Sequence, residues 1–219
     1  GLKAHSAVTK PLISRKNQKA RLSFVEEHVV WTKENCSKVY FSDESKFNLC
    51  GSDGKHYVQR QTGERLNPKC VKKSVKSGGG SVMVWGMFSA AVVGPLIQIH
   101  GRMNAAKYRD ILDENLLQSA LDLRLGRRFT FQQDNDPKHT AKITKEWLYN
   151  NSVTVFEWTS QSSDSTNLWR DLKMAVHQRL PSNLTEMERI CKVEWQRIPK
   201  SRCDLVFPKK THGCIRLKG

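Results

Sequence analysis

The sequence has no long uninterrupted run of apolar residues. Its longest apolar stretch, 82–93, is broken by Gly86 and Ser89, and is therefore too short and too interrupted to cross a bilayer. No charged segment followed by an apolar one opens the chain, so a secretory signal is not indicated. We therefore expect an intracellular protein that has no membrane partner.

Motifs of several common enzyme classes are also missing. The six cysteines include no Cys-x-x-Cys pair, and no histidine stands at zinc spacing from them, so we interpret them as reduced and structural. There is no glycine-rich phosphate loop, no Gly-x-Ser-x-Gly elbow and no Ser-His-Asp arrangement. These absences argue against a zinc protein, a phosphate-loop enzyme and a serine hydrolase.

Acidic residues are scarce beside basic ones, with 21 Asp and Glu against 37 Lys and Arg, a net charge of +16 and a pI near 9.8. The basic excess gathers in residues 1–38, 55–76 and 192–219. Such blocks attract a polyanion, usually nucleic acid, although a solubilising surface is the alternative. The candidate DNA-binding residues are Arg15, Lys16, Lys19, Arg21, Lys69, Lys72, Lys73, Lys76 and Lys138.

At 219 residues, of which 38% are hydrophobic, the chain fits one domain with flanking arms. Apolar periodicity predicts an α/β order of elements. The predicted strands are 39–41, 55–60, 81–90, 95–100, 129–131 and 153–156, with a hairpin turning at Val93-Gly94. The predicted helices are one with Leu22, Val25, Val29 and Val30 on its apolar face, 104–125, 137–150, 167–180 and 185–197.

The stretch 129–142 reads FTFQQDNDPKHTAK and is the most informative in the chain. A short apolar strand leads to Asp134, and Asp136 with Pro137 then suits the start of a helix. Asp134 at a strand tip is a candidate metal ligand, and its alternative is a turn or cap residue. His139 could contact a phosphate or the groups around a metal, but we favour a solvated first-turn residue.

A second strand ends in acids at 38–49, which reads KVYFSDESKFNL and delivers Asp43 and Glu44. The two stretches together resemble the catalytic domain of the Tc/mariner superfamily of DDE transposases, in which SDESKF carries the first acid and QQDNDPKHTAK the second. The resemblance continues in family order through GSDGKHYVQR, SVMVWGMFSA, GPLIQIHG, EWTSQS and NLWRDLK. It covers nearly the whole chain.

This resemblance implies a ribonuclease-H-like fold, with a mixed five-stranded sheet flanked by helices. It implies that Asp43 and Asp134 bind two divalent ions, Mg²⁺ or Mn²⁺, for DNA cleavage and strand transfer. The implied partners are double-stranded DNA, comprising transposon terminal inverted repeats and target DNA, and a second copy in a homodimer. The implied location is the nucleus.

The resemblance also divides the chain into three parts. Residues 1–37 are expected to be a basic linker and helix at the end of a helix-turn-helix DNA-binding region. Residues 38–198 are the expected catalytic domain, with a basic clamp-like loop at 61–80. Residues 199–219 are the expected basic tail.

The third acid of the family is the feature in which this sequence departs from the pattern. The family's segment reads approximately SQSPDLNPIENLW, whereas this chain reads SQSSDSTNLW, which is three residues shorter and has Thr166 in place of the Glu. Asp164 is a possible substitute, and Asp171 is expected to point away from the metal. We therefore predict an impaired transposase, with a catalytically inactive DNA-binding or dimerisation domain as the alternative.

Overall fold

The computed structural model describes residues 13–28, 30–50, 59–67, 70–71, 79–90, 92–122, 129–156 and 166–203. The helices of these residues are α1 (Arg15–His28), α2 (Lys33–Ser37), the short 3₁₀ helix η1 (Glu64–Leu66), α3 (Ala105–Asp122), α4 (Pro137–Thr140), α5 (Lys142–Asn150), α6 (Thr166–Gln178), α7 (Leu184–Gln196) and α8 (Lys200–Cys203). The strands are β1 (Val39–Asn48), β2 (Ser81–Ser89), β3 (Val93–Ile99), β4 (Thr130–Gln132) and β5 (Thr154–Phe156).

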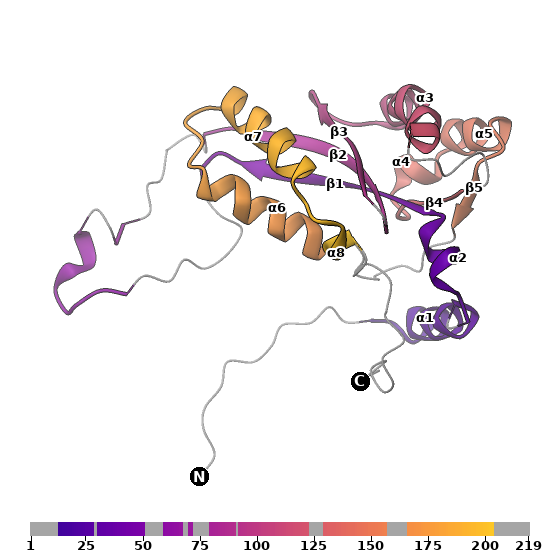
Figure 1. Cartoon of the computed structure of the whole chain (residues 1–219), viewed down its shortest axis with the longest axis horizontal. Helices are drawn as coiled ribbons and strands as arrows, with labels where there is room; N and C mark the ends of the chain where they lie inside the picture. Colours follow the sequence, from indigo (N-terminus) through magenta and orange to yellow (C-terminus); the bar gives the residue numbers. More distant parts are fainter. Residues whose placement is uncertain are drawn as a thin grey trace, which may run out of the picture.

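The strands form one sheet in the order β3-β2-β1-β4-β5 (Figure 1). The pairs β1–β2 and β2–β3 are antiparallel, whereas β1–β4 and β4–β5 are parallel. The predicted mixed five-stranded sheet is therefore confirmed. Because β4 inserts beside β1, two segments about 90 residues apart in the chain become neighbours.

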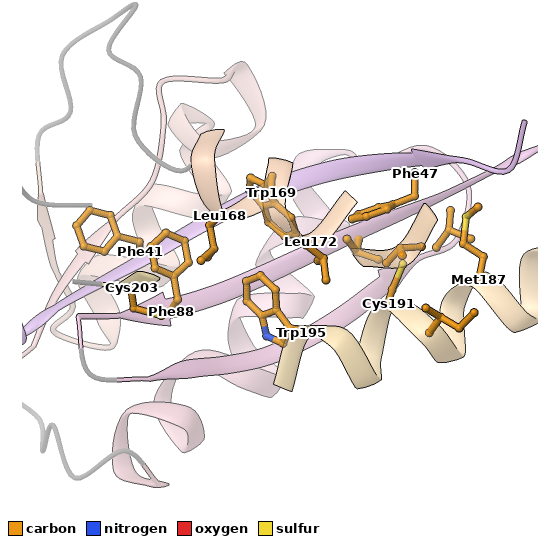
Figure 2. Close-up of a cluster of buried hydrophobic side chains, with 14 of the residues drawn as sticks. Phe41, Phe47, Phe88, Leu168, Trp169, Leu172, Met187, Cys191, Trp195 and Cys203 are labelled. Atoms are coloured by element: carbon orange, nitrogen blue, oxygen red, sulfur yellow. The ribbon is translucent and has the colours of Figure 1, made fainter. Parts of the chain in front are cut away.

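Helices cover both faces of the sheet, and each face has its own apolar core. Alternate residues of β1 point to opposite faces, so Phe41 and Phe47 join the core under α6 and α7, while Tyr40 joins the core under α3 and α5. Figure 2 shows the first of these cores, in which Trp169 of α6 and Trp195 of α7 lie between helices and sheet.

Two strand predictions need correction or remain open. The hairpin between β2 and β3 turns before Val93, since the Ser89 N–H donates to the carbonyl oxygen of Val92 and Gly94 already lies within β3. The prediction of a turn at Val93-Gly94 is therefore wrong. In the predicted strand 55–60, residues 55–58 lie outside the described residues, and residues 59–60 are not in a strand.

Local capping chemistry was predicted well. The Asn104 side chain accepts a hydrogen bond from the Lys107 N–H at 2.9 Å, which starts α3. Asp136 accepts from the Lys138 N–H at 3.0 Å, with proline at the first position of α4, as expected.

The extent of two predicted helices is wrong. The helix expected over 137–150 is broken at Ala141, whose extended backbone separates α4 from α5, and Ile143 is exposed. The helix expected to reach Leu180 ends at Gln178, and Leu180 takes a left-handed backbone and is 82% exposed.

Of the apolar face expected on the first helix, Leu22 and Val30 are exposed and α1 ends at His28, so these two residues contradict the prediction. The side chains of Val25 and Val29 lie outside the described residues. This helix packs instead through an aromatic contact of Phe24 with Phe156 of β5, with ring centroids 5.2 Å apart. Among the described residues no helix is long and apolar enough to span a membrane. The five described cysteines are free thiols, as predicted, and Cys214 lies outside the described residues.

Candidate active site

Asp43 lies in the middle of β1, on the face of the sheet that α6 covers. The prediction of a strand over 39–41 that ends in Asp43 and Glu44 is therefore wrong, because β1 continues to Asn48. The indole N–H of Trp169 donates to Asp43 Oδ2 at 2.9 Å, and the N–H of Glu44 donates to Oδ1 at 2.8 Å. Gly86 pairs with Asp43 across β1 and β2, and a Cβ there would stand only 2.8 Å from the Trp169 ring. The glycine thus makes room for the indole that orients the Asp43 carboxylate.

Asp134 lies two residues beyond the end of β4. The last pair in the parallel β1–β4 register is Phe41 with Gln132, so two further residues along both segments lead to Asp43 and Asp134. The two acids therefore lie just beyond the same end of the parallel β1–β4 pairing. The Asp134 side chain is 49% exposed, so solvent reaches it.

His139 connects Asp134 to the strand that carries Asp43. Its Nδ1 lies 2.5 Å from Asp134 Oδ1, and its Nε2 lies 3.0 Å from Glu44 Oε1. The side chain is only 2% exposed and packs on Tyr108 of α3, with ring centroids 4.2 Å apart. The prediction of a solvated His139 is therefore wrong.

In this network the hydrogen bonds between His139 and the carboxylates favour the charged form of both His139 and Asp134. Burial by itself lowers the pKa of His139, but the hydrogen bonds to Asp134 and Glu44 outweigh it and raise that pKa to about 9. The hydrogen bond from His139 lowers the pKa of Asp134 against the opposing effect of burial. An imidazolium with a carboxylate on each ring nitrogen is consistent with both directions.

Lys138 is a second cation beside Glu44. Its Nζ lies 3.4 Å from Glu44 Oε2 and 3.0 Å from Asp136 Oδ2, and its side chain is 16% exposed. Burial by itself lowers the pKa of Lys138. The charge of Glu44 and the hydrogen bond to Asp136 outweigh this effect, so the pKa lies above its ordinary value. Lys138 is engaged by two carboxylates of its own chain, and its predicted contact with DNA stays a prediction.

The segment expected to carry the third acid leads into α6. Helix α6 begins at Thr166, and Trp169, three residues later, lies about one turn along the helix. The start of α6 is thus one turn from the residue that bonds Asp43. Asp164 lies outside the described residues, as does the side chain of Thr166. Asp171 pairs with Arg202 of α8, which agrees with the expectation that it points away from the site.

The predicted DNA-binding residues are only partly described. Arg15, Lys16 and Lys19 are exposed on α1, and Arg21 is half-buried. The predicted contacts Lys69, Lys72, Lys73 and Lys76 lie outside the described residues. Among the described residues no group of three or more His, Cys, Asp or Glu side chains could hold a metal ion.

Two contacts of the candidate site were not predicted from the sequence. Trp169 was not expected to bond Asp43, although its place in NLWRDLK, next to the third-acid position, pointed to this region. The role of Glu44 in holding His139 was also missed, and its adjacency to Asp43 in SDESKF was the available signal.

Comparison with curated proteins decides the family. The chain is 40% identical over 225 residues to the Tcb2 transposase of Caenorhabditis briggsae, an alignment that covers all of this chain and 82% of that protein. The chain belongs to the Tc1/mariner family of transposases. It is also 40% identical over 204 residues to the Tc1 transposase of Caenorhabditis elegans, covering 92% of this chain and 74% of that protein. No family model matches this transposase chain.

Solved structures of similar fold are Mos1 mariner transposases. The paired-end complex with Mn aligns with a TM-score of 0.71 at 14% identity, covering 94% of this chain and 62% of that chain. The Mos1 catalytic domain aligns with a TM-score of 0.62 at 14% identity, covering 91% and 90%. These likenesses confirm the predicted ribonuclease-H-like fold, and the chain is a Tc1/mariner transposase catalytic domain.

Proposed function

We propose that this domain catalyses metal-dependent DNA cleavage and strand transfer, as in cut-and-paste transposition and integration, and that the reaction is impaired. The observation that carries the proposal is the β1–β4 register, in which Asp43 and Asp134 both lie two residues beyond the last parallel pair. Membership of the transposase family supports assigning DNA chemistry to these two acids.

We propose that Asp43 and Asp134 bind Mg²⁺ or Mn²⁺, with two ions in an intact site. The donors fit such ions, since carboxylate oxygens are their preferred ligands and the half-exposed Asp134 is open to solvent. Solved structures of Mos1 with Mg and with Mn support the use of divalent ions. A bound pair of ions supplies an activated nucleophile and stabilises the leaving oxygen.

Neighbouring side chains orient the carboxylates of the two acids by hydrogen bonds. Trp169 holds Asp43 Oδ2 from the α6 side, and His139 holds Asp134 Oδ1 from the opposite side. Each hydrogen bond occupies one of the roughly four acceptor positions of a carboxylate. These hydrogen bonds orient the two acids.

The defect that we propose is the loss of one charged ligand at the start of α6. Thr166 offers a neutral hydroxyl, which is a poor replacement for a carboxylate beside a divalent cation. Asp164 is the one nearby acid that we keep as a possible substitute. The same loss favours the alternative function, a domain that binds DNA or dimerises without cutting it.

We propose double-stranded DNA as the partner, with transposon terminal repeats and target DNA as its two forms, bound in the nucleus by a homodimer. Solved Mos1 paired-end and strand-transfer complexes support this choice. The proposed organisation is a DNA-binding linker and helix over 1–37, a catalytic domain over 38–198 with a clamp-like loop at 61–80, and a basic tail over 199–219.

The chain is expected to bind duplex DNA with little sequence preference and with a steep dependence on salt. Its charge of +16 would displace counterions from several phosphates, so raising the salt from about 50 to 200 mM should weaken binding about 1,000-fold. Fluorescence anisotropy with two unrelated duplexes measures this. The slope of the logarithm of the binding constant against the logarithm of the salt concentration measures how many phosphates are neutralised. Changing the exposed Arg15, Lys16 and Lys19 to Ala should make this slope shallower by about one for each phosphate contact that is lost.

A complex that selects one duplex by its sequence and is insensitive to salt would contradict this prediction. Replacing the exposed Glu26 and Glu27 of α1 by Gln serves as the matched control, because it changes the same helix without removing a cation. The alternative function is separated from the proposed one by Mn²⁺-dependent nicking of a supercoiled plasmid. Complete absence of nicking, even after the third acid is restored, would favour the non-cutting domain.

A further inference from the structure

Glu44 and Asp43 are neighbours on β1 but serve opposite faces of the sheet. Asp43 bonds Trp169 of α6, whereas Glu44 bonds His139 of α4 and pairs with Lys138. Glu44 is well shielded, with an 11% exposed side chain. Glu is not favoured in strands, and a shielded carboxylate needs cationic partners. Glu44 has two such partners, His139 and Lys138, directly next to Asp43.

The ring of His139 is held on several sides. Its two nitrogens bond Asp134 and Glu44, and one ring face packs on Tyr108. The Tyr108 hydroxyl donates to Gln133 Oε1 at 2.8 Å, and Gln133 is the residue before Asp134. Since Gln133 Nε2 also donates to the carbonyl oxygen of His139 at 3.4 Å, the turn between β4 and α4 is closed around the histidine.

Glu44, His139 and Asp134 form a hydrogen-bonded bridge from β1 to the segment after β4. Asp134 lies beyond the last backbone pair of the two strands, so the sheet ladder does not fix its side chain. The chain Glu44–His139–Asp134 ties that side chain to the residue next to Asp43 on β1. The bridge thus joins Asp134 to β1 on the face opposite to α6, and the N–H of Asp136 donates to the same Asp134 Oδ1 at 3.0 Å.

We propose that Glu44 and His139 are positioning residues, which hold the Asp134 carboxylate at a fixed place relative to Asp43 before a metal ion binds. This inference rests on the proposed function, because holding Asp134 in place relative to Asp43 matters for metal binding only if the two acids share a metal site. Hydrogen-bonding partners of metal ligands commonly affect metal affinity by 10–100-fold. The bridge is such a partner for Asp134.

A pair of histidine variants tests the bridge one bond at a time. The amide of Asn lies near the position of Nδ1, so His139→Asn can still donate to Asp134 but releases Glu44. The amide of Gln lies near Nε2, so His139→Gln can still donate to Glu44 but releases Asp134. The control is Thr144→Val, which removes a buried hydrogen bond of 2.8 Å to the carbonyl oxygen of Lys138 without touching either acid.

The first readout is Mn²⁺ affinity, measured by water-proton relaxation on the full chain with the metal alone as probe. We expect His139→Gln to bind Mn²⁺ about tenfold more weakly than the wild type, His139→Asn to lose clearly less, and Thr144→Val to bind as the wild type does. Melting temperatures recorded in parallel show how much each variant loosens the fold. Equal affinity losses in His139→Gln and Thr144→Val would mean that His139 only packs, and would overturn the inference.

The second readout needs no metal and separates the two proposals. Amide hydrogen exchange of residues 134–140 in the metal-free chain is expected to be faster in His139→Gln than in His139→Asn, since only the former releases Asp134. If Mn²⁺ binding fails to depend on Asp43 and Asp134, the metal-site proposal fails, and this exchange difference still decides whether the bridge holds Asp134. Identical exchange in both variants would overturn the bridge itself.

Discussion

Restoring the third acid is expected to raise Mn²⁺-dependent nicking of a supercoiled plasmid by about 100-fold or more. The change replaces residues 163–166 by Pro-Asp-Leu-Asn-Pro-Ile-Glu, which returns both the spacing and the carboxylate to the start of α6. Charge stabilisation by metal ions contributes several kcal/mol to such reactions, and about 3 kcal/mol corresponds to roughly 100-fold. The initial rate of conversion of supercoiled to open-circular DNA is the measurement.

Two controls isolate the carboxylate in this experiment. The same insertion ending in Gln restores the spacing without the charge and should stay near the rate of the unmodified chain. Asp43→Ala in the restored chain provides the blank. Robust nicking by the unmodified chain that disappears in Asp164→Ala would show that Asp164 already serves as the third ligand and that the proposed defect does not exist.

Trp195→Ala is expected to lower the free energy of unfolding by about 3–5 kcal/mol, which is a large part of the roughly 5–15 kcal/mol typical of a domain. Trp195 is 1% exposed, its ring stacks on Trp169 at 5.1 Å, and its indole N–H donates to the carbonyl oxygen of Gly94 at 2.8 Å. Removing it opens a cavity beneath the indole that orients Asp43. Urea unfolding followed by circular dichroism gives the change.

The size of this effect is judged against two further variants. Trp195→Phe keeps an aromatic ring but loses the hydrogen bond to Gly94, so its loss of stability should be clearly smaller. Val193→Ala alters a 38% exposed residue on the same helix and should change stability by about 0.5 kcal/mol or less. A Trp195→Ala loss no greater than that of Val193→Ala would show that α7 is not an essential part of this core.

Local chemistry explains what could be predicted from the sequence. Asn104 and Asp136 cap their helices because a side-chain oxygen near its own chain meets the orphan N–H groups of the first turn, and this needs no distant partner. The acids at 43 and 134 were likewise found from strands that run into polar residues. Family resemblance then supplied the ribonuclease-H-like fold with its mixed five-stranded sheet, which alternation alone does not determine.

Interactions over long sequence distances explain what could not be predicted. His139 is buried because Glu44, 95 residues away, and Tyr108 of α3 enclose it, and helical periodicity carries no information about either. Trp147 of α5 is buried and its indole N–H donates to Asp113 of α3, 34 positions away, whereas Ile143 on the same helix is exposed. The hydrogen bond from Trp169 to Asp43 joins residues 126 positions apart.

The proposed function depends above all on Asp43 and Asp134 forming one metal-binding pair, and Mn²⁺ binding by the unmodified chain is the decisive test. Calorimetry should compare the wild type with Asp43→Asn, Asp134→Asn and the control Asp171→Asn, whose carboxylate pairs with Arg202 away from the site. We expect weak binding by the wild type and by Asp171→Asn, and a loss of at least about tenfold in each of the other two variants, because ligand charge sets the affinity. Equal binding by all four proteins would refute the pairing and leave Asp134 as a residue that only ends a strand.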